Sequence, residues 1–293
     1  FERYIRDQEG SSGQPKWSAT SLNEVSDRRI RDLPPLARRL VHIVALAAPP
    51  VVLSSLKAIP ELSAEEFNAA LSIATDHGVL VEDATDGSIA FHHDRLEHAA
   101  TRTVDDTEVV TAAVQVLESG IATGNAHASY NLARHLATAT ESSGATVSGD
   151  NMRAMESVSH RVTEMIPVPR RIALLEANAR RMLEAFAPIE AARFVRAAEK
   201  TFEQNPSETA SLSKITLYNY GHTAAFFADD GLGMSRYFTR LRGQVDRLTL
   251  NRLRELWVTR CYDRMWITGA WRIGRIILTD LGALPTGSAD MQH

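Results

Sequence analysis

The sequence predicts a mainly α-helical protein: a small helical module with one β-hairpin, followed by an array of paired helices. Three observations lead to this class. Apolar residues recur at helical spacing along most of the 293 residues, the pattern of amphipathic helices. Two short apolar runs, 79–81 and 89–91, flank a polar turn, as in a hairpin. In the C-terminal half, similar segments return roughly every 40 residues, a spacing typical of stacked helix pairs.

The composition is that of a folded chain without a membrane span. Apolar residues make up 44% and charged residues 23%, so packed cores are expected and disorder is not. The longest mostly apolar stretch, 41–53, is interrupted by a histidine and two prolines and is too short to cross a bilayer. No secretion signal opens the chain, and we expect a cytoplasmic protein without a membrane partner. Because the chain begins at Phe1 within a charged stretch, we interpret it as a piece of a longer protein.

The formal net charge of -4 is spread unevenly along the chain. Residues 1–104 carry 11 basic and 15 acidic side chains, residues 105–205 carry 10 and 13, and residues 206–293 carry 11 and 8. Lys214 is the single lysine of this last part. A protein that binds nucleic acid has a much stronger basic bias. We therefore expect no nucleic-acid partner and assign the arginines to solvated helix surface.

The first elements in chain order are helices separated by a polar loop. Residues 1–9 have the pattern of a helix end, residues 10–21 that of a loop, and residues 23–33 that of a second helix. Pro34 and Pro35 begin the next helix, since the fixed φ of proline suits a first turn. The apolar face of that helix is formed by Leu36, Leu40, Val44 and Ala47.

Two further helices are expected before the hairpin. A short apolar helix is predicted over 51–59. Ser63 and Glu66 have the spacing of a capping box, which begins a third helix. Gly78 stands where a left-handed residue ends that helix. The inward face of the third helix is predicted to consist of Phe67, Ala70, Leu71 and Ala74.

The hairpin at 79–91 is followed by a closing helix. Asp94 is expected as its N-cap, and the helix is predicted over 94–104 with apolar residues on one face. Three helices, a hairpin and a closing helix are the elements of a winged-helix domain. We assign that domain to residues 34–104.

The remainder of the chain has a helical pattern. Three similar segments begin at Ala187, Gly231 and Gly269, which are 44 and 38 residues apart. Each opens the second helix of a pair, and the first helices are expected near 170–186, 210–228 and 246–267. This period predicts an α-solenoid of tetratricopeptide-like helix pairs over residues 105–285. A polar tail follows at 286–293.

Cysteine and tryptophan residues are assigned to the core of this array. The single cysteine, Cys261, excludes a disulfide framework and a multi-cysteine zinc site. It shares an apolar stripe with Trp257 and Met265, so we expect an inert buried thiol. We expect Trp257, Trp266 and Trp271 to pack between repeats.

Sequence motifs for catalysis are missing. The chain contains no phosphate loop, no Gly-x-Ser-x-Gly elbow and no His-Glu-x-x-His helix. The densest polar cluster consists of His92, His93, Asp94 and His98. A metal-dependent hydrolase would need further ligands, and the nearest are His42 and His77, which no spacing links to the cluster. We therefore expect surface histidines, no catalytic residue and no metal site, with a stand-alone hydrolase as the alternative.

A winged helix also raises the question of DNA binding, because such domains often place their third helix in the major groove. Here the helix over 63–77 contains Glu65, Glu66 and Asp76 and neither Lys nor Arg. Phosphate contacts supply most of the non-specific affinity for DNA, and an acidic helix repels the backbone. We expect this helix to pack within the protein.

Two stretches carry a resemblance to a known family: 33–40, Leu-Pro-Pro-Leu-Ala-Arg-Arg-Leu, and 91–100, Phe-His-His-Asp-Arg-Leu-Glu-His-Ala-Ala. Together they resemble the region that follows the ATPase core in STAND-type signalling ATPases, above all multidomain hybrid sensor histidine kinases and their serine/threonine-kinase relatives. In that family a Leu-Pro helix opens the winged helix and Phe-x-His-Asp-Arg-Val-x-x-Ala-Ala-Tyr closes it. The matching residues are Phe91, His93, Asp94, Arg95, Ala99 and Ala100. Thr101 departs from the family's Tyr, and residues 269–285 resemble the last helices of the family's helical array.

The resemblance implies a regulatory segment without chemistry of its own. Residues 1–33 would be the end of the ATPase lid region and a linker, with the phosphate loop upstream and the output domains downstream. ATP or ADP with Mg would bind the full-length protein, an ATPase-linked kinase, and no cofactor would bind this segment. In related switches a winged-helix histidine touches the ADP phosphate, and His93 is the matching residue.

Two functions fit this resemblance. In the first, the segment couples an upstream nucleotide switch to a kinase output in a phosphorelay, and its partners are the ATPase and kinase domains of the same chain. In the second, it belongs to a large ATP-binding transcriptional activator, and the helical repeats bind an inducer or a partner. In both, the repeats offer a surface for a protein or a small molecule.

Overall fold

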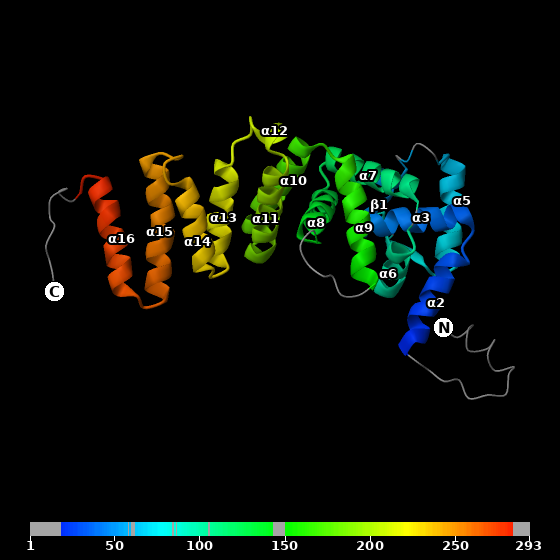
Figure 1. Ribbon diagram of the computed structural model, residues 1–293. Helices are drawn as coiled ribbons and strands as arrows, with labels where there is room; N and C mark the ends of the chain where they lie inside the picture. The colour runs from blue at the N-terminus through cyan, green and yellow to red at the C-terminus, as the bar shows by residue number, and fades with distance from the viewer. Residues whose placement is uncertain are drawn as a thin grey trace. The chain divides into compact units, whose positions relative to one another are not determined.

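The computed structural model describes residues 19–283 except 58, 60, 61, 84, 86, 105 and 143–149 (Figure 1). The described residues form the helices α2 to α16 and three short strands, so the predicted mainly helical class with a small β element is confirmed. The chain divides into two compact units, Phe1–Val116 and Leu117–His293. The helix end predicted at 1–9, most of the loop at 10–21 and the tail at 286–293 lie outside the described residues.

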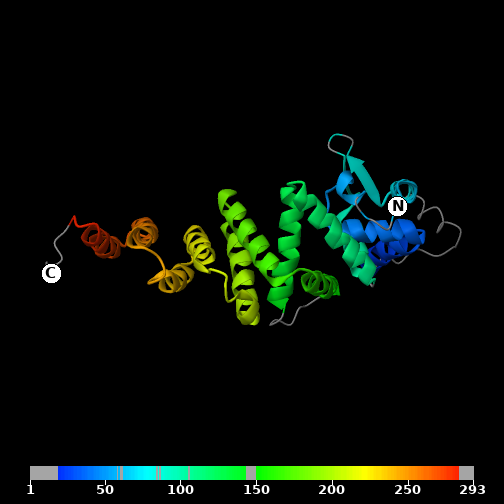
Figure 2. The ribbon, with the colours of Figure 1, turned by 90° about the horizontal axis from the view of Figure 1, so that it is seen from above.

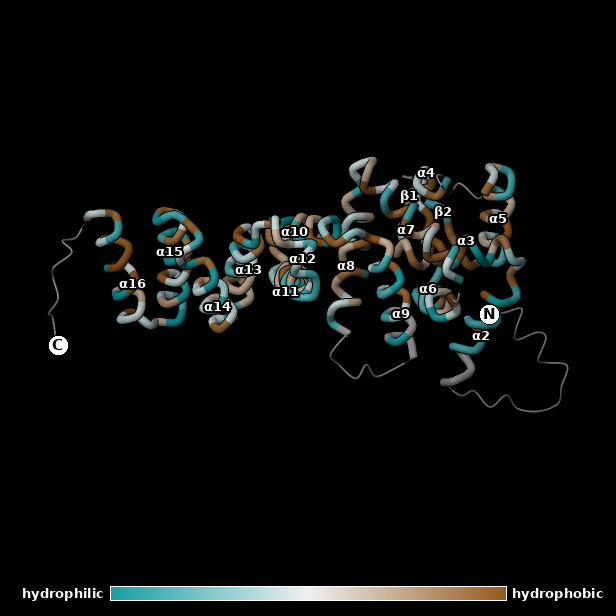
Figure 3. Tube along the Cα trace, turned by 45° about the horizontal axis from the view of Figure 1, so that its top comes forward, coloured by the Kyte–Doolittle hydropathy of each residue, from teal (hydrophilic) through white to brown (hydrophobic). Residues whose placement is uncertain are grey.

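The helices of the first unit form around one apolar core. The four longest described helices that lie wholly within this unit are α2 (Ala19–Arg31), α3 (Pro35–Leu46), α5 (Ala64–Asp76) and α6 (Asp94–Arg102). α3 packs against α5 and α6, and α2 packs against α6. Hydrophobic colour runs along much of α3 (Figure 3), which is buried from Leu40 to Leu46. The largest fully buried side chains of this core include Ile30, Leu40, Ile43, Leu46, Leu56, Ile59, Phe67, Leu80 and Ile89.

A three-stranded antiparallel sheet completes the first unit. Its strands are β1 (Val51–Val52), β2 (Leu80–Asp83) and β3 (Ser88–Phe91), in the order β1-β3-β2. β2 and β3 form the predicted hairpin, with Leu80 opposite Phe91, and Figure 2 shows it projecting beside the helices of this unit. At its turn Gly87 has φ +66°, a left-handed conformation that glycine adopts without strain.

The prediction of a helix over 51–59 is wrong. Val51 and Val52 are extended and pair with Ile89 and Ser88 of β3, and only α4 (Leu53–Leu56) is helical there. Two adjacent β-branched residues favour an extended strand when a partner strand is present. The backbone N–H of Leu53 also donates to the carbonyl of Gly87, at 2.9 Å, which fixes the segment against the hairpin turn.

The predicted capping box at the start of α5 is present. The backbone N–H of Glu66 donates to Ser63 Oγ at 3.2 Å, and that of Ser63 donates to Glu66 Oε2 at 2.9 Å. These bonds satisfy donors that a helix start leaves without partners. The Ser63 side chain and backbone together hold the pKa of Glu66 below its usual value.

Ser63→Ala is expected to lower the stability of the first unit by about 1 kcal/mol, because it removes the side-chain half of the capping box. Urea denaturation followed by circular dichroism measures this loss. Ser54→Ala, at an exposed position of α4, is the control and is expected to change stability by less than about 0.5 kcal/mol. Equal effects of the two substitutions would contradict a stabilising role for the cap.

The second unit is helical throughout its described residues. Helix α7 (Thr107–Ala122) runs across the boundary into it, and α8 (Ala126–Ser142) contacts α9 (Asp150–Met165), α10 and α11. Three antiparallel pairs follow, namely α10 (Val168–Glu184) with α11 (Pro188–Gln204), α13 (Ile215–Phe227) with α14 (Gly231–Leu241), and α15 (Arg247–Asp263) with α16 (Ile267–Asp280). The short helix α12 (Pro206–Thr209) connects the first pair to the second.

The three helix pairs share one turn geometry. Phe186, Asp229 and Met265 have positive φ values of 55°, 58° and 57°. In each turn this residue's N–H bonds to the carbonyl three positions back, at 2.9–3.1 Å, and the next N–H bonds to the carbonyl five positions back, at 2.7–2.8 Å. This hydrogen-bond pattern is that of a Schellman motif, in which a right-handed helix ends at a residue with left-handed backbone angles. The three turn residues lie 43 and 36 residues apart.

Burial follows the same register. Five positions after the turn residue, the buried residues are Ala191, Met234 and Ala270. Twelve positions after it they are Ala198, Leu241 and Ile277, and twelve positions before it they are Leu174, Leu217 and Leu253. The predicted starts at Ala187, Gly231 and Gly269 lie close to the turns but drift by one to four residues from them.

The assignments of aromatic residues to this core need correction. Trp266 and Trp271 are 58% and 54% exposed, and Met265 lies exposed in a turn. Their packing between described repeats was therefore predicted wrongly. Met265 and Trp266 belong to the turn, into which the helical spacing continues, and Trp271 lies on an exposed face of α16. Cys261 is buried, as predicted, and burial raises the pKa of its thiol.

Candidate functional site

The predicted histidine cluster lies on the surface of the first unit. His92, His93 and His98 are exposed, as predicted, and the rings of His92 and His93 lie 6.0 Å apart. The N-cap of α6 is His93, with φ -155° and ψ 137°, and Asp94 is the first helical residue. The prediction of Asp94 as the N-cap is therefore wrong by one residue, because the backbone is still extended at His93, two residues after β3 ends.

The other two histidines considered as ligands have different surroundings. His42 is buried in α3, and its Nε2 lies 3.1 Å from the Thr103 hydroxyl. His77 follows α5 as its C-cap. Within the described ranges, no three His, Cys, Asp or Glu side chains converge on one point as a metal site requires. The first unit thus presents exposed imidazoles rather than an assembled centre.

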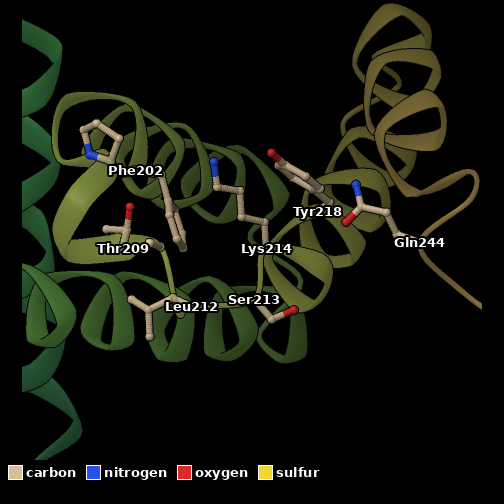
Figure 4. Close-up of a pocket in the computed structure, with 9 residues that line it drawn as sticks. Phe202, Thr209, Leu212, Ser213, Lys214, Tyr218 and Gln244 are labelled. Atoms are coloured by element: carbon tan, nitrogen blue, oxygen red, sulfur yellow. The ribbon is translucent and has the colours of Figure 1, made fainter.

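A cavity lies in the second unit, at the junction between the first and second helix pairs. It is open to solvent on one side and has a volume of about 520 Å³. The end of α11, α12, the segment 210–214 and the start of α13 form it, with Gln244 at its rim (Figure 4). The chain turns sharply here because Pro206 begins α12 directly after α11. The lining residues are Phe202, Pro206, Thr209, Ala210, Leu212, Ser213, Lys214, Tyr218 and Gln244.

Aromatic rings flank the single cation of this cavity. The Lys214 ammonium lies 4.9 Å from the centre of the Phe202 ring, a distance at which a cation is attracted to the ring face. Figure 4 shows the Lys214 amine and the Tyr218 hydroxyl pointing the same way beside the Phe202 ring. Burial, together with the nearby carboxylate of Glu203, raises the pKa of Tyr218, so its hydroxyl remains a donor at neutral pH.

Each of the remaining polar side chains of the cavity has one backbone partner. Thr209 Oγ1 donates to the Asn205 carbonyl at 2.8 Å, and Gln244 Nε2 donates to the Arg240 carbonyl at 2.7 Å. Ser213 Oγ accepts from the Ile215 N–H at 3.3 Å.

By contrast, the Lys214 ammonium and the Tyr218 hydroxyl make no hydrogen bond to any described residue. These two groups are therefore donors that the cavity offers to a ligand, beside the hydroxyl proton of the exposed Ser213, which has no acceptor among the described residues.

A buried ionic network lies behind Tyr218. Glu199 of α11 is 8% exposed and accepts a hydrogen bond from the Tyr237 hydroxyl at 3.0 Å. It forms an ion pair with Arg240 and lies 3.5 Å from a guanidinium nitrogen of Arg236. The Arg240 guanidinium also covers the ring of Tyr218, 5.2 Å from its centre. The network thus connects the two helix pairs and fixes one wall of the cavity.

A buried histidine in the second helix pair, α13 with α14, has no polar partner. His222 of α13 is fully buried, and neither ring nitrogen has a hydrogen-bond partner. Its ring lies 6.4 Å from that of Phe238. Burial lowers its pKa from 6.5 to about 4, because an apolar core disfavours the charged imidazolium. His222 is therefore a neutral, destabilising polar group within the helix array.

Comparison with known proteins adds no relative: the sequence matches no family model, no curated protein and no solved structure. Across the described residues, no helix combines the length and apolarity that a membrane crossing demands.

The cavity was not predicted from the sequence. Lys214 was distinguished only as the single lysine of residues 206–293. Phe202, Tyr218 and Gln244 belong to no motif, and they meet only because α12 folds the chain back between two helix pairs. A lone lysine between two aromatic residues, next to a proline-containing break, is the one signal that could have indicated them.

Proposed function

We propose that this chain is a non-catalytic regulatory segment of a larger, cytoplasmic ATP-dependent signalling protein. In this proposal residues 34–104 form a winged-helix domain and residues 105–285 a tetratricopeptide-like α-solenoid. Together they couple an upstream nucleotide switch to a downstream kinase output in a phosphorelay. The partners are the ATPase and kinase domains of the same chain, and ATP or ADP with Mg belongs to the ATPase domain.

The observation that carries the proposal is the repeated turn of the second unit. Three helix pairs with the same left-handed turn and the same buried positions are the units from which solenoids are built. Solenoids bind other proteins or ligands along extended surfaces and do not concentrate catalytic groups. The first unit supports the winged-helix assignment by its order of elements, with the antiparallel strands β2 and β3 between α5 and α6.

His93 is the residue we propose to sense the nucleotide. Its side chain is exposed and makes no hydrogen bond to the described part of the chain, so it is accessible to a phosphate on a neighbouring domain. An imidazolium that donates to a phosphate forms a charge-assisted hydrogen bond, worth about 1.5–3 kcal/mol. If this bond forms only in the ADP-bound state, it favours that state of a two-state switch.

His93→Ala in the full-length protein is expected to weaken ADP retention and to raise basal kinase output by about tenfold, the equivalent of 1.4 kcal/mol. The measurements are the release rate of a fluorescent ADP analogue and autophosphorylation. His92→Ala is the matched control and is expected to change neither. A lowered melting temperature with unchanged ADP release and output would show that His93 only supports the fold. ATP turnover by the present chain alone would overturn the regulatory assignment.

The cavity supports a second candidate function, in which this chain is the equivalent segment of an ATP-binding transcriptional activator. There the helical repeats would bind an inducer, and a cavity of about 520 Å³ with free donors has the size of a small-molecule site. The two functions differ in the output domain: a helix-turn-helix domain downstream would favour the activator, and a kinase core would favour the phosphorelay.

A further inference from the structure

We infer that the cavity between α11, α12 and α13 binds a small carboxylate that carries an aromatic or branched apolar group. This goes beyond the proposed coupling function, because it assigns a ligand class to a place on the helical array. Its support is the chemistry of the lining residues, and it stands whether or not a nucleotide switch lies upstream.

The size and the walls of the cavity fit the apolar part of such a ligand. Its volume of about 520 Å³ lies within the range of roughly 300–1,000 Å³ that is usual for small-molecule sites. The Phe202 ring is almost fully buried and forms a fixed base beneath the Lys214 ammonium. Pro206, Ala210 and Leu212, which are exposed or partly exposed, supply the apolar surface that a ligand can contact.

Two donors without partners define the charge of the ligand. The Lys214 ammonium and the Tyr218 hydroxyl point the same way (Figure 4), and one carboxylate can accept a hydrogen bond from each. Among the lining residues Lys214 is the only cation and none is acidic. The ammonium already faces the Phe202 ring, so a carboxylate would bind on its open side.

A phosphate dianion fits this arrangement less well than a carboxylate. Arg240, the nearest further cation over Tyr218, is paired with Glu199. The carboxylate of Glu203 lies close enough to Tyr218 to raise its pKa, and it would repel a second negative charge. A site with one cation, hydroxyl donors and a nearby carboxylate therefore favours a monoanion.

Binding would join successive helix pairs. Phe202 belongs to the first pair, Tyr218 to the second, and Gln244 to the turn before the third. A ligand that contacts all three stabilises the folded array in proportion to its occupancy. The melting temperature of the second unit is therefore expected to rise with the concentration of a fitting carboxylate.

The probe for this site is 3-phenylpropionate, tested on the chain as it stands by isothermal titration calorimetry. We expect saturable binding, and binding of the neutral analogue 3-phenylpropionamide at least about tenfold weaker, since it has lost the charge that Lys214 recognises. Inorganic phosphate at equal concentration is expected not to displace the probe. Equal affinity for acid and amide, or displacement by phosphate, would overturn the assignment of a carboxylate site.

Variants locate the binding. Lys214→Met is expected to weaken binding of 3-phenylpropionate by about tenfold or more, and Tyr218→Phe by about threefold. Lys57→Met removes an exposed lysine of the first unit and is expected to leave the affinity unchanged. Circular dichroism melting verifies that each variant folds; if Lys214→Met does not fold, Tyr218→Phe decides. No binding by the wild type, or equal binding by the wild type and the folded variants, would refute the site, whatever the outcome for His93 in the full-length protein.

Discussion

Glu199→Ala is expected to lower the free energy of unfolding of the second unit by about 2–3 kcal/mol. The substitution leaves the buried Tyr237 hydroxyl without its carboxylate acceptor and Arg240 without its ion-pair partner. Loss of one member of a buried polar network costs more than the network contributes as a whole, because the remaining groups stay buried and unpaired. Arg240 and Arg236 are partly exposed and can be rehydrated, which keeps the cost below that of a fully enclosed pair.

Two variants test this assignment by urea denaturation. Glu199→Gln keeps an acceptor for Tyr237 and removes the charge, so we expect a smaller loss of about 1 kcal/mol. Glu203→Ala removes an exposed carboxylate one turn further along α11 and is expected to change stability by less than about 0.5 kcal/mol. Similar losses for Glu199→Ala and Glu203→Ala would show that the network does not join the two helix pairs.

The same network connects stability with the proposed ligand site. Arg240 is held by Glu199 on one side and covers Tyr218 on the other. Without Glu199 the Arg240 guanidinium becomes a free cation beside the cavity, which changes the charge that an anionic ligand meets. Glu199→Ala is therefore a poor probe of ligand affinity, and Lys214 and Tyr218 are the positions at which binding should be tested.

Local signals predicted the parts of the fold that depend on neighbouring residues. The capping box of Ser63 and Glu66, the left-handed Gly78 and the hairpin turn at Gly87 all occur where the sequence places them. Each depends on bonds made within a few residues. The strand at Val51 and Val52 was missed because it forms only against β3, almost 40 residues later, and no local pattern distinguishes it from a short apolar helix.

The repeat register shows a different limit. Left-handed turn residues are usually recognised as Gly or Asn, but here they are Phe186, Asp229 and Met265. The second helices also differ in length, with 17, 11 and 14 residues. Comparison of small and apolar residues along the sequence therefore found the helix pairs but not the position of the turn that the pairs share. That turn is defined by its backbone conformation and not by a residue type. The cavity was missed for the related reason that its residues come from different helix pairs.

The stability of the second unit is expected to fall as the pH is lowered from about 6.5 to about 4, by about 3 kcal/mol, because of His222. Its pKa is about 4 in the folded chain and 6.5 in an ordinary, solvated state. Between these values the unfolded chain binds a proton that the folded chain does not, so protonation favours unfolding. Above pH 6.5 His222 is neutral in both states and contributes no pH dependence. Urea denaturation at a series of pH values measures this slope.

His222→Leu should remove that slope and stabilise the folded array. Leucine fills a similar volume without the two ring nitrogens that lack partners, so we expect a gain of about 1 kcal/mol at neutral pH and a larger gain near pH 5. His160→Leu removes an exposed imidazole from α9 and is the matched control, which should retain the pH dependence of the wild type. If His222→Leu keeps the full slope between pH 6.5 and 4, the acid sensitivity originates elsewhere. The buried, unpaired His222 therefore lowers the stability of the helical array. Because His222 does not line the cavity, its replacement is expected to change stability without changing the groups that contact a ligand.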